Sequence, residues 1–231
     1  DKQALIFKDQ NISFRQLRDE TFKLANALKG LGIQKGDKVA IYLPNCPEYI
    51  YSYLAVFCLG LTGVPLDFML KEDEIVSCLT HSEAKYLIYI PKENLSPKDL
   101  KAVVPALKTI ISCQPNVEGS FFFHELTAQA SSVAVNVSIQ DPDTSLIMYT
   151  SGTTGRPKGV VLNYKHLDGS PEAMHHFVDL TENDVKLCAL PLSHIAGLIY
   201  IQNCILFGIA LVLMERFNPV EFLRNIQQYK I

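Results

Sequence analysis

The chain has 231 residues, of which 48% are hydrophobic, so it is long enough to bury a large core. Its 21 basic and 24 acidic residues leave a formal net charge of -3, and no basic block of five or more residues occurs. This balance disfavours a nucleic-acid partner, because a phosphate backbone requires concentrated Lys and Arg. The composition predicts a soluble metabolic protein.

The six cysteines lie mostly in apolar stretches, and none are paired as Cys-x-x-Cys. Zinc and thioredoxin-type sites are therefore disfavoured, because their ligand spacing is missing. A reduced cysteine in apolar surroundings behaves as a small hydrophobic residue, so we expect a reducing, cytoplasmic compartment. The apolar stretches at 50–66 and 204–214 are either interrupted by Pro and Gly or about half the roughly 20 residues of a spanning helix. We therefore expect no transmembrane segment.

The first half of the chain alternates helical periodicity with short β-branched runs. A capping box of Ser13 and Gln16 opens a helix, and Gly32 is placed to end it in a left-handed conformation. A buried strand is predicted at 38–43, followed by a proline-marked turn. The remaining pattern of this half predicts strands at 64–66, 86–90 and 108–112, and helices at 48–59, at 73–79 and from Ser96 and Pro97 onward.

From 114 to 144 the periodicity weakens, and a helical turn at 124–130 beside a polar stretch indicates a connector. Beyond it the pattern predicts strands at 145–149, 159–163, 185–189 and 210–214, and helices at 164–177 and 194–207. The last helix has Asn218 as its N-cap, Pro219 at its first position and Glu221 completing a capping box. Strands separated by helices indicate parallel βαβ units in a layered α/β fold. We expect two α/β portions, at 1–113 and 145–231, joined by the connector at 114–144.

The segment YTSGTTGRPKG at 149–159 lies between two predicted strands and offers almost no side-chain volume for packing. Its glycines permit backbone angles that a Cβ would block, and exposed amides in such a loop form an anion-binding concavity. Short hydroxyls and one lysine suit a phosphate, whereas the spacings of the Walker and Rossmann loops are absent. The alternative is a flexible Gly/Ser/Thr hairpin without a ligand. The residues expected to contact phosphate are Thr150, Ser151, Gly152, Thr153, Thr154, Gly155 and Lys158.

The same segment resembles the signature phosphate loop of the adenylate-forming (ANL) superfamily, which includes acyl- and aryl-CoA synthetases, luciferases and adenylation domains of nonribosomal peptide synthesis. The match is unbroken from Thr150 to Gly159. Other segments resemble the family in the same order: ISFRQLRDETFKLANALKGLGIQKGDKVAIYLPNCPEYI, LAVFCLGLTGVPLDFML and LPLSHIAGL. The resemblance covers nearly the whole chain and is weakest at 114–144.

This resemblance implies a ligase that works in two steps. A carboxylate attacks the α-phosphate of Mg-ATP, giving an acyl-adenylate and pyrophosphate, and a thiol, usually coenzyme A, then displaces AMP. Phosphoryl chemistry rests mainly on positioning and charge neutralisation, which fits the loop. The resemblance makes Lys158 a catalytic residue that favours the departing pyrophosphate; the alternative is a lysine that only keeps the loop soluble.

The resemblance also makes His194 a catalytic residue, because the family carries a histidine beside the acyl pocket in the segment that LPLSHIAGL resembles. The alternative is a core histidine with a satisfied partner. Amino-acid-activating members carry an acid in this segment, and this chain has none there, so a fatty or aryl acid is favoured. The other histidines (81, 124, 166, 175 and 176) show no metal-ligand spacing, and no residue is assigned to a metal.

Family members are normally much longer than this chain. The Tyr-Gly-x-Thr-Glu adenine and magnesium motif, the ribose-binding Asp and the small C-terminal domain have no counterpart in it. We therefore interpret the chain as a truncated N-terminal adenylating domain of the acyl-CoA synthetase type, and we expect it to be inactive alone. The alternative function is a non-catalytic nucleotide- or acyl-binding module. The oligomeric state stays open.

Overall fold

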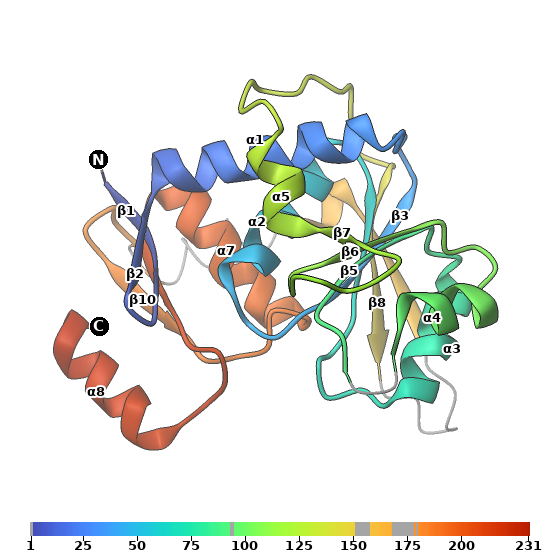
Figure 1. Cartoon of the computed structure of the whole chain (residues 1–231). Coiled ribbons are helices and arrows are strands. Elements are labelled where there is room, and N and C mark those ends of the chain that lie inside the picture. Colours follow the sequence, from blue (N-terminus) through green and yellow to red (C-terminus); the bar gives the residue numbers. More distant parts are fainter. Residues whose placement is uncertain (1, 93–94, 151–157, 168–177, 179) are drawn as a thin grey trace.

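The computed structural model describes residues 2–92, 95–150, 158–167, 178 and 180–231. Within these residues the strands form two sheets, with helices between them and on their outer faces (Figure 1). The layered α/β architecture expected from the sequence is confirmed. The division of the strands between two separate sheets was not predicted, because local periodicity does not reveal which strands pair.

The larger sheet has the strand order β7-β6-β5-β3-β4-β8-β9. Its neighbouring strands are parallel except β8 and β9, which form an antiparallel pair. Parallel neighbours require crossover connections, and the helices that follow β3, β4 and β5 provide them. The bounds are β3 (Lys38–Tyr42), β4 (Thr62–Pro65), β5 (Tyr86–Tyr89), β6 (Thr109–Ser112), β7 (Phe121–Phe122), β8 (Thr144–Thr150) and β9 (Lys158–Asn163).

The smaller sheet joins the two ends of the chain. Its order is β10-β11-β1-β2, built from β10 (Val185–Cys188), β11 (Ala210–Leu213), β1 (Gln3–Phe7) and β2 (Gln10–Ser13). Strand β1 pairs with β2 in an antiparallel hairpin and with β11 in parallel, so that Leu5 lies opposite Leu211. The two ends of the chain accordingly lie on the same side of the molecule in Figure 1. The hairpin of β1 and β2 was not predicted from the sequence.

The helices begin and end close to their predicted positions. The Ser13 hydroxyl accepts the Gln16 N–H at 3.2 Å, and the Gln16 side chain accepts the Ser13 N–H at 2.8 Å, which confirms the capping box. Gly32 has φ +82°, as expected beyond a helix end. The Asn218 side chain accepts two backbone N–H groups of the last helix. The bounds are α1 (Phe14–Gly30), α2 (Pro47–Cys58), α3 (Glu72–Ser82), α4 (Pro97–Val103), α5 (Phe123–Ala128), α7 (Ile195–Phe207) and α8 (Pro219–Tyr229).

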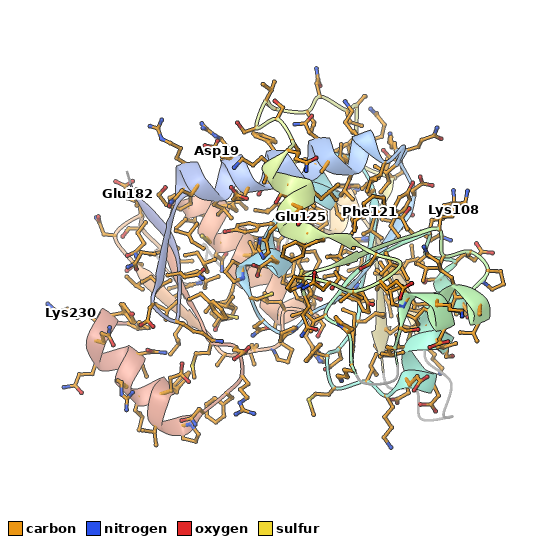
Figure 2. The ribbon with its side chains drawn as sticks, in the orientation of Figure 1. Asp19, Lys108, Phe121, Glu125, Glu182 and Lys230 are labelled. Atoms are coloured by element: carbon orange, nitrogen blue, oxygen red, sulfur yellow. The ribbon has the colours of Figure 1, made fainter. Side chains whose placement is uncertain are left out.

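Three hydrophobic clusters define the layers. The largest joins both sheets through α1, α2 and α7, with Leu24, Tyr53 and Leu198 each fully or almost fully buried. A second cluster lies on the other face of the larger sheet, under α3 and α4, and a third lies under α8. Figure 2 shows side chains filling the space between these layers, whereas the labelled Lys108, Glu182 and Lys230 lie at the outer edge. The sheets are therefore held at a fixed separation by the helices packed between them.

The segment predicted as a connector contains β7 and α5. Its polar part is attached to α1, because the Asn26 side-chain amide donates to the carbonyl oxygens of Ser131 and Val133 at 2.8 Å each. The predicted helix at 164–177 is helical at 164–167, and its other residues lie outside the described part of the chain. The division into portions at 1–113 and 145–231 stays a prediction. No helix in the described ranges is long and apolar enough to span a membrane.

Candidate active site at the carboxyl edges of two sheets

A cavity of about 540 Å³ lies where the carboxyl ends of both sheets meet. Ligands of open α/β folds bind outside the carboxyl ends of parallel strands, because the connecting loops leave a crevice there. Much of its lining is apolar, and its charged residues are Asp67, Glu215 and Arg216. Glu215 forms an ion pair with Lys8 at 3.0 Å. The residues that follow the four strands and line the cavity include Leu43 and Asn45 after β3, Asp67 and Met69 after β4, Leu192 and Ser193 after β10, and Arg216 and Phe217 after β11.

Asn45 connects the two sheets at this edge. Its side-chain amide donates to the carbonyl oxygens of Leu190 and Met214, both at 2.9 Å, and its Oδ1 accepts the N–H of Leu192 at 2.8 Å. The residue is 6% exposed, so these hydrogen bonds are shielded from water. A buried amide with this many backbone partners fixes the segments it joins, because breaking any contact leaves a buried polar group unpaired. The ends of β3, β10 and β11 are therefore held together.

The segment that leads to His194 is held by a second buried side chain. Tyr53 in α2 donates its hydroxyl to the Leu192 carbonyl oxygen at 3.0 Å, and burial raises the pKa of Tyr53. The His194 N–H donates to the Pro191 carbonyl oxygen at 3.1 Å, and His194 is the N-cap of α7. Gly197 packs so closely that a Cβ there would overlap the Pro191 carbonyl oxygen. The glycine of this motif is therefore required for close approach of α7 to the preceding turn.

His194 faces an acid from the other sheet. Its Nε2 lies 3.4 Å from Oδ2 of Asp67, and the His194 and Asp67 side chains are 62% and 33% exposed. His194 is thus an exposed residue beside the cavity, which disfavours the alternative of a buried core histidine. Its partner comes from the turn after β4 and not from its own segment. The local sequence did not predict this acid, because the two residues are 127 positions apart.

The ends of the glycine-rich loop lie at the same edge of the larger sheet. Strand β8 is parallel to β4, so its last residue, Thr150, lies on the side where β3 and β4 end. The ladder places Lys158 directly opposite Thr150. Because β9 is two strands from β4, Lys158 lies roughly 10 Å along the sheet from the end of β4. The two ends of the loop, Thr150 and Lys158, therefore lie at the same edge of the larger sheet as the cavity.

Tyr149 fixes the start of the loop. Its hydroxyl donates to the Cys78 carbonyl oxygen at 3.1 Å and lies 2.8 Å from Nδ1 of His81. Both partners are in α3, and burial, together with the charge of Cys78, raises the pKa of Tyr149 to about 12. Lys158 is exposed at the other end of the loop. The remaining predicted phosphate contacts lie outside the described residues: Ser151, Gly152, Thr153, Thr154 and Gly155.

Three other histidines have ordinary structural contacts. His81 contacts Tyr149, His124 lies 3.4 Å from Glu48, and His166 accepts the Asn163 N–H. In the ranges that the structure describes, no three His, Cys, Asp or Glu side chains are grouped as metal ligands. The histidines at 175 and 176 lie outside those ranges.

Comparison with known protein families identifies the family of this chain. The profile of the family described as AMP-binding enzyme matches residues 1–231, the whole chain. The chain belongs to this family. The resemblance of its loop to the adenylate-forming enzymes is thereby confirmed.

Relatives of this AMP-binding chain are CoA ligases. It is 34% identical to 2-succinylbenzoate–CoA ligase of Bacillus licheniformis over 231 residues, which is 100% of this chain and 45% of that protein. It is 33% identical to 4-coumarate–CoA ligase 1 of Solanum tuberosum over 96% of this chain and 42% of that protein. The chain therefore spans less than half the length of these relatives.

A solved structure shares the fold. The o-succinylbenzoate coenzyme A synthetase of Bacillus subtilis, in complex with ATP and magnesium ion, matches with a TM-score of 0.85 and 30% identity, over 100% of this chain and 46% of that chain. The fold of the AMP-binding chain is thus the fold of the first part of such a synthetase.

Asn45 and Asp67 of this AMP-binding chain were not predicted as site residues from the sequence. Asn45 was visible only as part of the turn LPNCPE, and nothing local shows that its partners lie 145 to 169 residues later. The available signal was its place directly after a buried strand, where parallel strands bring ligand-binding residues together. The same signal applies to Asp67, two residues beyond β4.

Proposed function

We propose that the protein containing this chain activates a carboxylic acid with ATP, forming an acyl-adenylate and pyrophosphate, and transfers the acyl group to the thiol of coenzyme A. The observation that carries this proposal is the placement of the loop ends, Thr150 and Lys158, at the same carboxyl edge as the cavity beside His194. Membership of the AMP-binding family and relatives named as CoA ligases support it.

The loop is assigned to the phosphates of ATP. Thr150 and Lys158 stand at its two ends, and Ser151, Thr153 and Thr154 with the loop amides complete the proposed contacts. Lys158 supplies positive charge where the departing pyrophosphate develops negative charge, which lowers the barrier to departure. Gly152 and Gly155 allow the backbone to approach the phosphate oxygens.

The cavity is assigned to the acid, with His194 at its side. Its apolar walls suit the hydrocarbon part of a fatty or aryl acid. The only acid that the described contacts place at His194 is Asp67, and Asp67 already accepts the Met69 N–H at 2.8 Å as well as facing His194. It is therefore engaged within the protein, which favours a plain carboxylic acid over an amino acid.

Magnesium is proposed to bind with the phosphates of ATP, since the described residues offer no cluster of metal ligands. The proposed division keeps 1–113 and 145–231 as α/β portions and 114–144 as the connector of the adenylating part.

A cytoplasmic location is proposed from the cysteines. All six are free, and burial raises their pKa, to about 11 for Cys78 and about 12 for Cys204.

The test is ATP–pyrophosphate exchange with the full-length protein, Mg²⁺ and a panel of aryl, fatty and amino acids. We expect exchange with at least one aryl or fatty acid, followed by thioester formation when coenzyme A is added. Binding of ATP without exchange for any acid would contradict the proposal and favour a nucleotide-binding module. Exchange only with amino acids would contradict the assigned substrate class.

A further inference from the structure

Among the residues described, one contact between ionisable side chains joins the carboxyl edges of the two sheets at the cavity. It is the contact of Asp67 with His194. Asp67 comes from the larger sheet and lines the cavity, whereas His194 comes from the turn after β10 in the smaller sheet. The distance between Oδ2 and Nε2 is 3.4 Å. This contact sets the orientation of the His194 ring if other contacts hold the backbone of both residues in place.

Asp67 is held by its own turn. Its Oδ1 accepts the Met69 N–H at 2.8 Å, and its carbonyl oxygen accepts the Leu70 N–H at 3.0 Å. The first of these bonds occupies one carboxylate oxygen and leaves the second for His194. An acid fixed in this way loses little conformational freedom when it takes a further partner.

His194 is held by its backbone. Its N–H is bonded to Pro191, the Leu198 N–H donates to its carbonyl oxygen at 3.2 Å, and Asn45 and Tyr53 fix Leu192 two residues earlier. Its side chain makes no capping hydrogen bond to α7. The backbone therefore sets where the ring begins, and the contact with Asp67 sets how the ring is turned.

An ionised carboxylate only accepts hydrogen bonds, so the nitrogen that contacts it must carry a proton. We propose that Asp67 is a positioning residue that keeps the proton on Nε2 of His194 and directs the ring, leaving Nδ1 for the ligand. This inference rests on the proposed function for its catalytic consequence. A carboxylate that selects the tautomer and orientation of a histidine does so without touching the substrate.

Asp67→Asn separates this role from the role of Asp67 in its turn. The asparagine oxygen still accepts the Met69 N–H, but the remaining amide group donates, which favours an unprotonated Nε2. Asp67→Ala removes both functions. A residue that only maintains the turn is rescued by Asn, whereas a residue that sets the histidine proton is not.

The chain offers a matched control. His124 and Glu48 form a second histidine–carboxylate contact, also at 3.4 Å between Nε2 and Oε1, and neither residue lines the cavity. Glu48→Gln makes the same chemical change to a similar pair. It is expected to leave the His194 ring and the kinetics unchanged.

The first measurement is the ¹⁵N spectrum of the histidine rings in the full-length protein. We expect Nε2 of His194 to carry the proton in the wild type and to lose this preference in Asp67→Asn, but not in Glu48→Gln. A ring protonated on Nδ1 alone in the wild type, or a tautomer unaffected by Asp67→Asn, would overturn the proposal. This measurement needs no activity, so it remains decisive if no acid is ever activated.

The second measurement is the kinetics of the full-length protein with its best acid. Asp67→Asn and Asp67→Ala are both expected to raise KM for the acid about three- to tenfold, with kcat changed less than about twofold. A lowered kcat at unchanged KM would show that Asp67 acts in the transition state and not in presenting the acid, and full rescue by Asn would show a structural role only; either outcome contradicts the inference. In a His194→Ala background Asp67→Asn is expected to have no further effect, because coupled residues are not additive.

Discussion

The side-chain amide of Asn45 donates to the carbonyl oxygen of Met214 at 2.9 Å, and so joins the end of β3 in one sheet to the end of β11 in the other. The two residues are 169 positions apart. This bond, with those to Leu190 and Leu192, sets the distance between the two walls of the cavity. The stability of the fold and the geometry of the site therefore depend on the same buried amide.

Asn45→Ala is expected to lower the free energy of unfolding by about 3 kcal/mol, because the buried Leu192 N–H and the buried Met214 carbonyl oxygen lose their Asn45 partner. Denaturant unfolding followed by circular dichroism measures this change. Asn183→Ala, at an exposed position, is the control and is expected to change stability by less than about 0.5 kcal/mol. Equal stabilities for the two variants would show that the hydrogen bonds of Asn45 do not help to hold the two sheets together.

Gly197→Ala is expected to destabilise the chain and to displace the turn that carries His194. The added Cβ would overlap the Pro191 carbonyl oxygen and lie 2.8 Å from Cα of Leu192, so the backbone must move. Gly30→Ala is the matched control, because nothing lies within 4 Å of its added Cβ. That control is expected to be neutral or to stabilise α1 by up to about 1 kcal/mol. Thermal unfolding of both variants tests the pair; an unchanged melting temperature for Gly197→Ala would contradict the assigned close approach.

Lys158→Ala in the full-length protein is expected to slow ATP–pyrophosphate exchange by about 10- to 100-fold without changing thermal stability, since a charge that meets a leaving group contributes to this extent. The residue is exposed at the first position of β9, so its removal leaves no cavity. Lys165→Ala, another exposed lysine seven positions on, is expected to retain exchange. If Lys158→Ala exchanges at the wild-type rate, the lysine serves only the solubility of the loop.

Asp143 is expected to make stability depend on pH in the acid range. Hydrogen bonds from Lys35 at 2.6 Å and from the Gln140 N–H at 2.7 Å hold the pKa of Asp143 below its ordinary value of 3.8. A lowered folded-state pKa means that this stabilisation is fully present above pH 3.8 and is lost as pH falls through the folded pKa. The melting-temperature difference between wild type and Asp143→Asn should therefore shrink below that pH.

The control for this pH dependence is Asp141→Asn, because the Asp141 side chain is exposed and makes no ion pair among the described contacts. Its difference from the wild type is expected to stay nearly constant with pH. A difference for Asp143→Asn that grows as the pH falls would contradict the sign derived from its lowered pKa.

Residues 1–231 alone are expected to form no acyl-adenylate with any acid. We assign the cavity to the acid and the loop to the phosphates and assign no described residue to the adenine or ribose, so we expect the α-phosphate not to be fixed in line with the attacking carboxylate. Missing orientation forfeits roughly 7–11 kcal/mol of barrier reduction. Pyrophosphate exchange with the isolated chain measures this, with the full-length protein as the positive control; signal above blank with any acid would show that the site is more complete than we infer.

The sequence by itself determined what is local. The glycines, hydroxyls and lysine of YTSGTTGRPKG indicate a phosphate loop because their chemistry depends on neighbours within a few residues. The capping side chains of Ser13 and Asn218 were likewise predicted, since a helix cap contacts backbone groups only two or three residues away. The strands and helices predicted from periodicity lie within a few residues of their predicted positions where the structure describes them, but β1, β2 and β7 were not predicted.

Tertiary structure alone decided which distant segments meet. The pairing of Leu5 with Leu211, the bridge made by Asn45 and the contact between Asp67 and His194 each join residues more than 100 positions apart. Periodicity shows which face of a strand is buried but not which strand lies beside it. Nothing in the sequence around a polar turn residue shows which distant residue it contacts. The phosphate loop could therefore be predicted from the residues, whereas the acid that faces His194 appeared only when the two sheets were brought together.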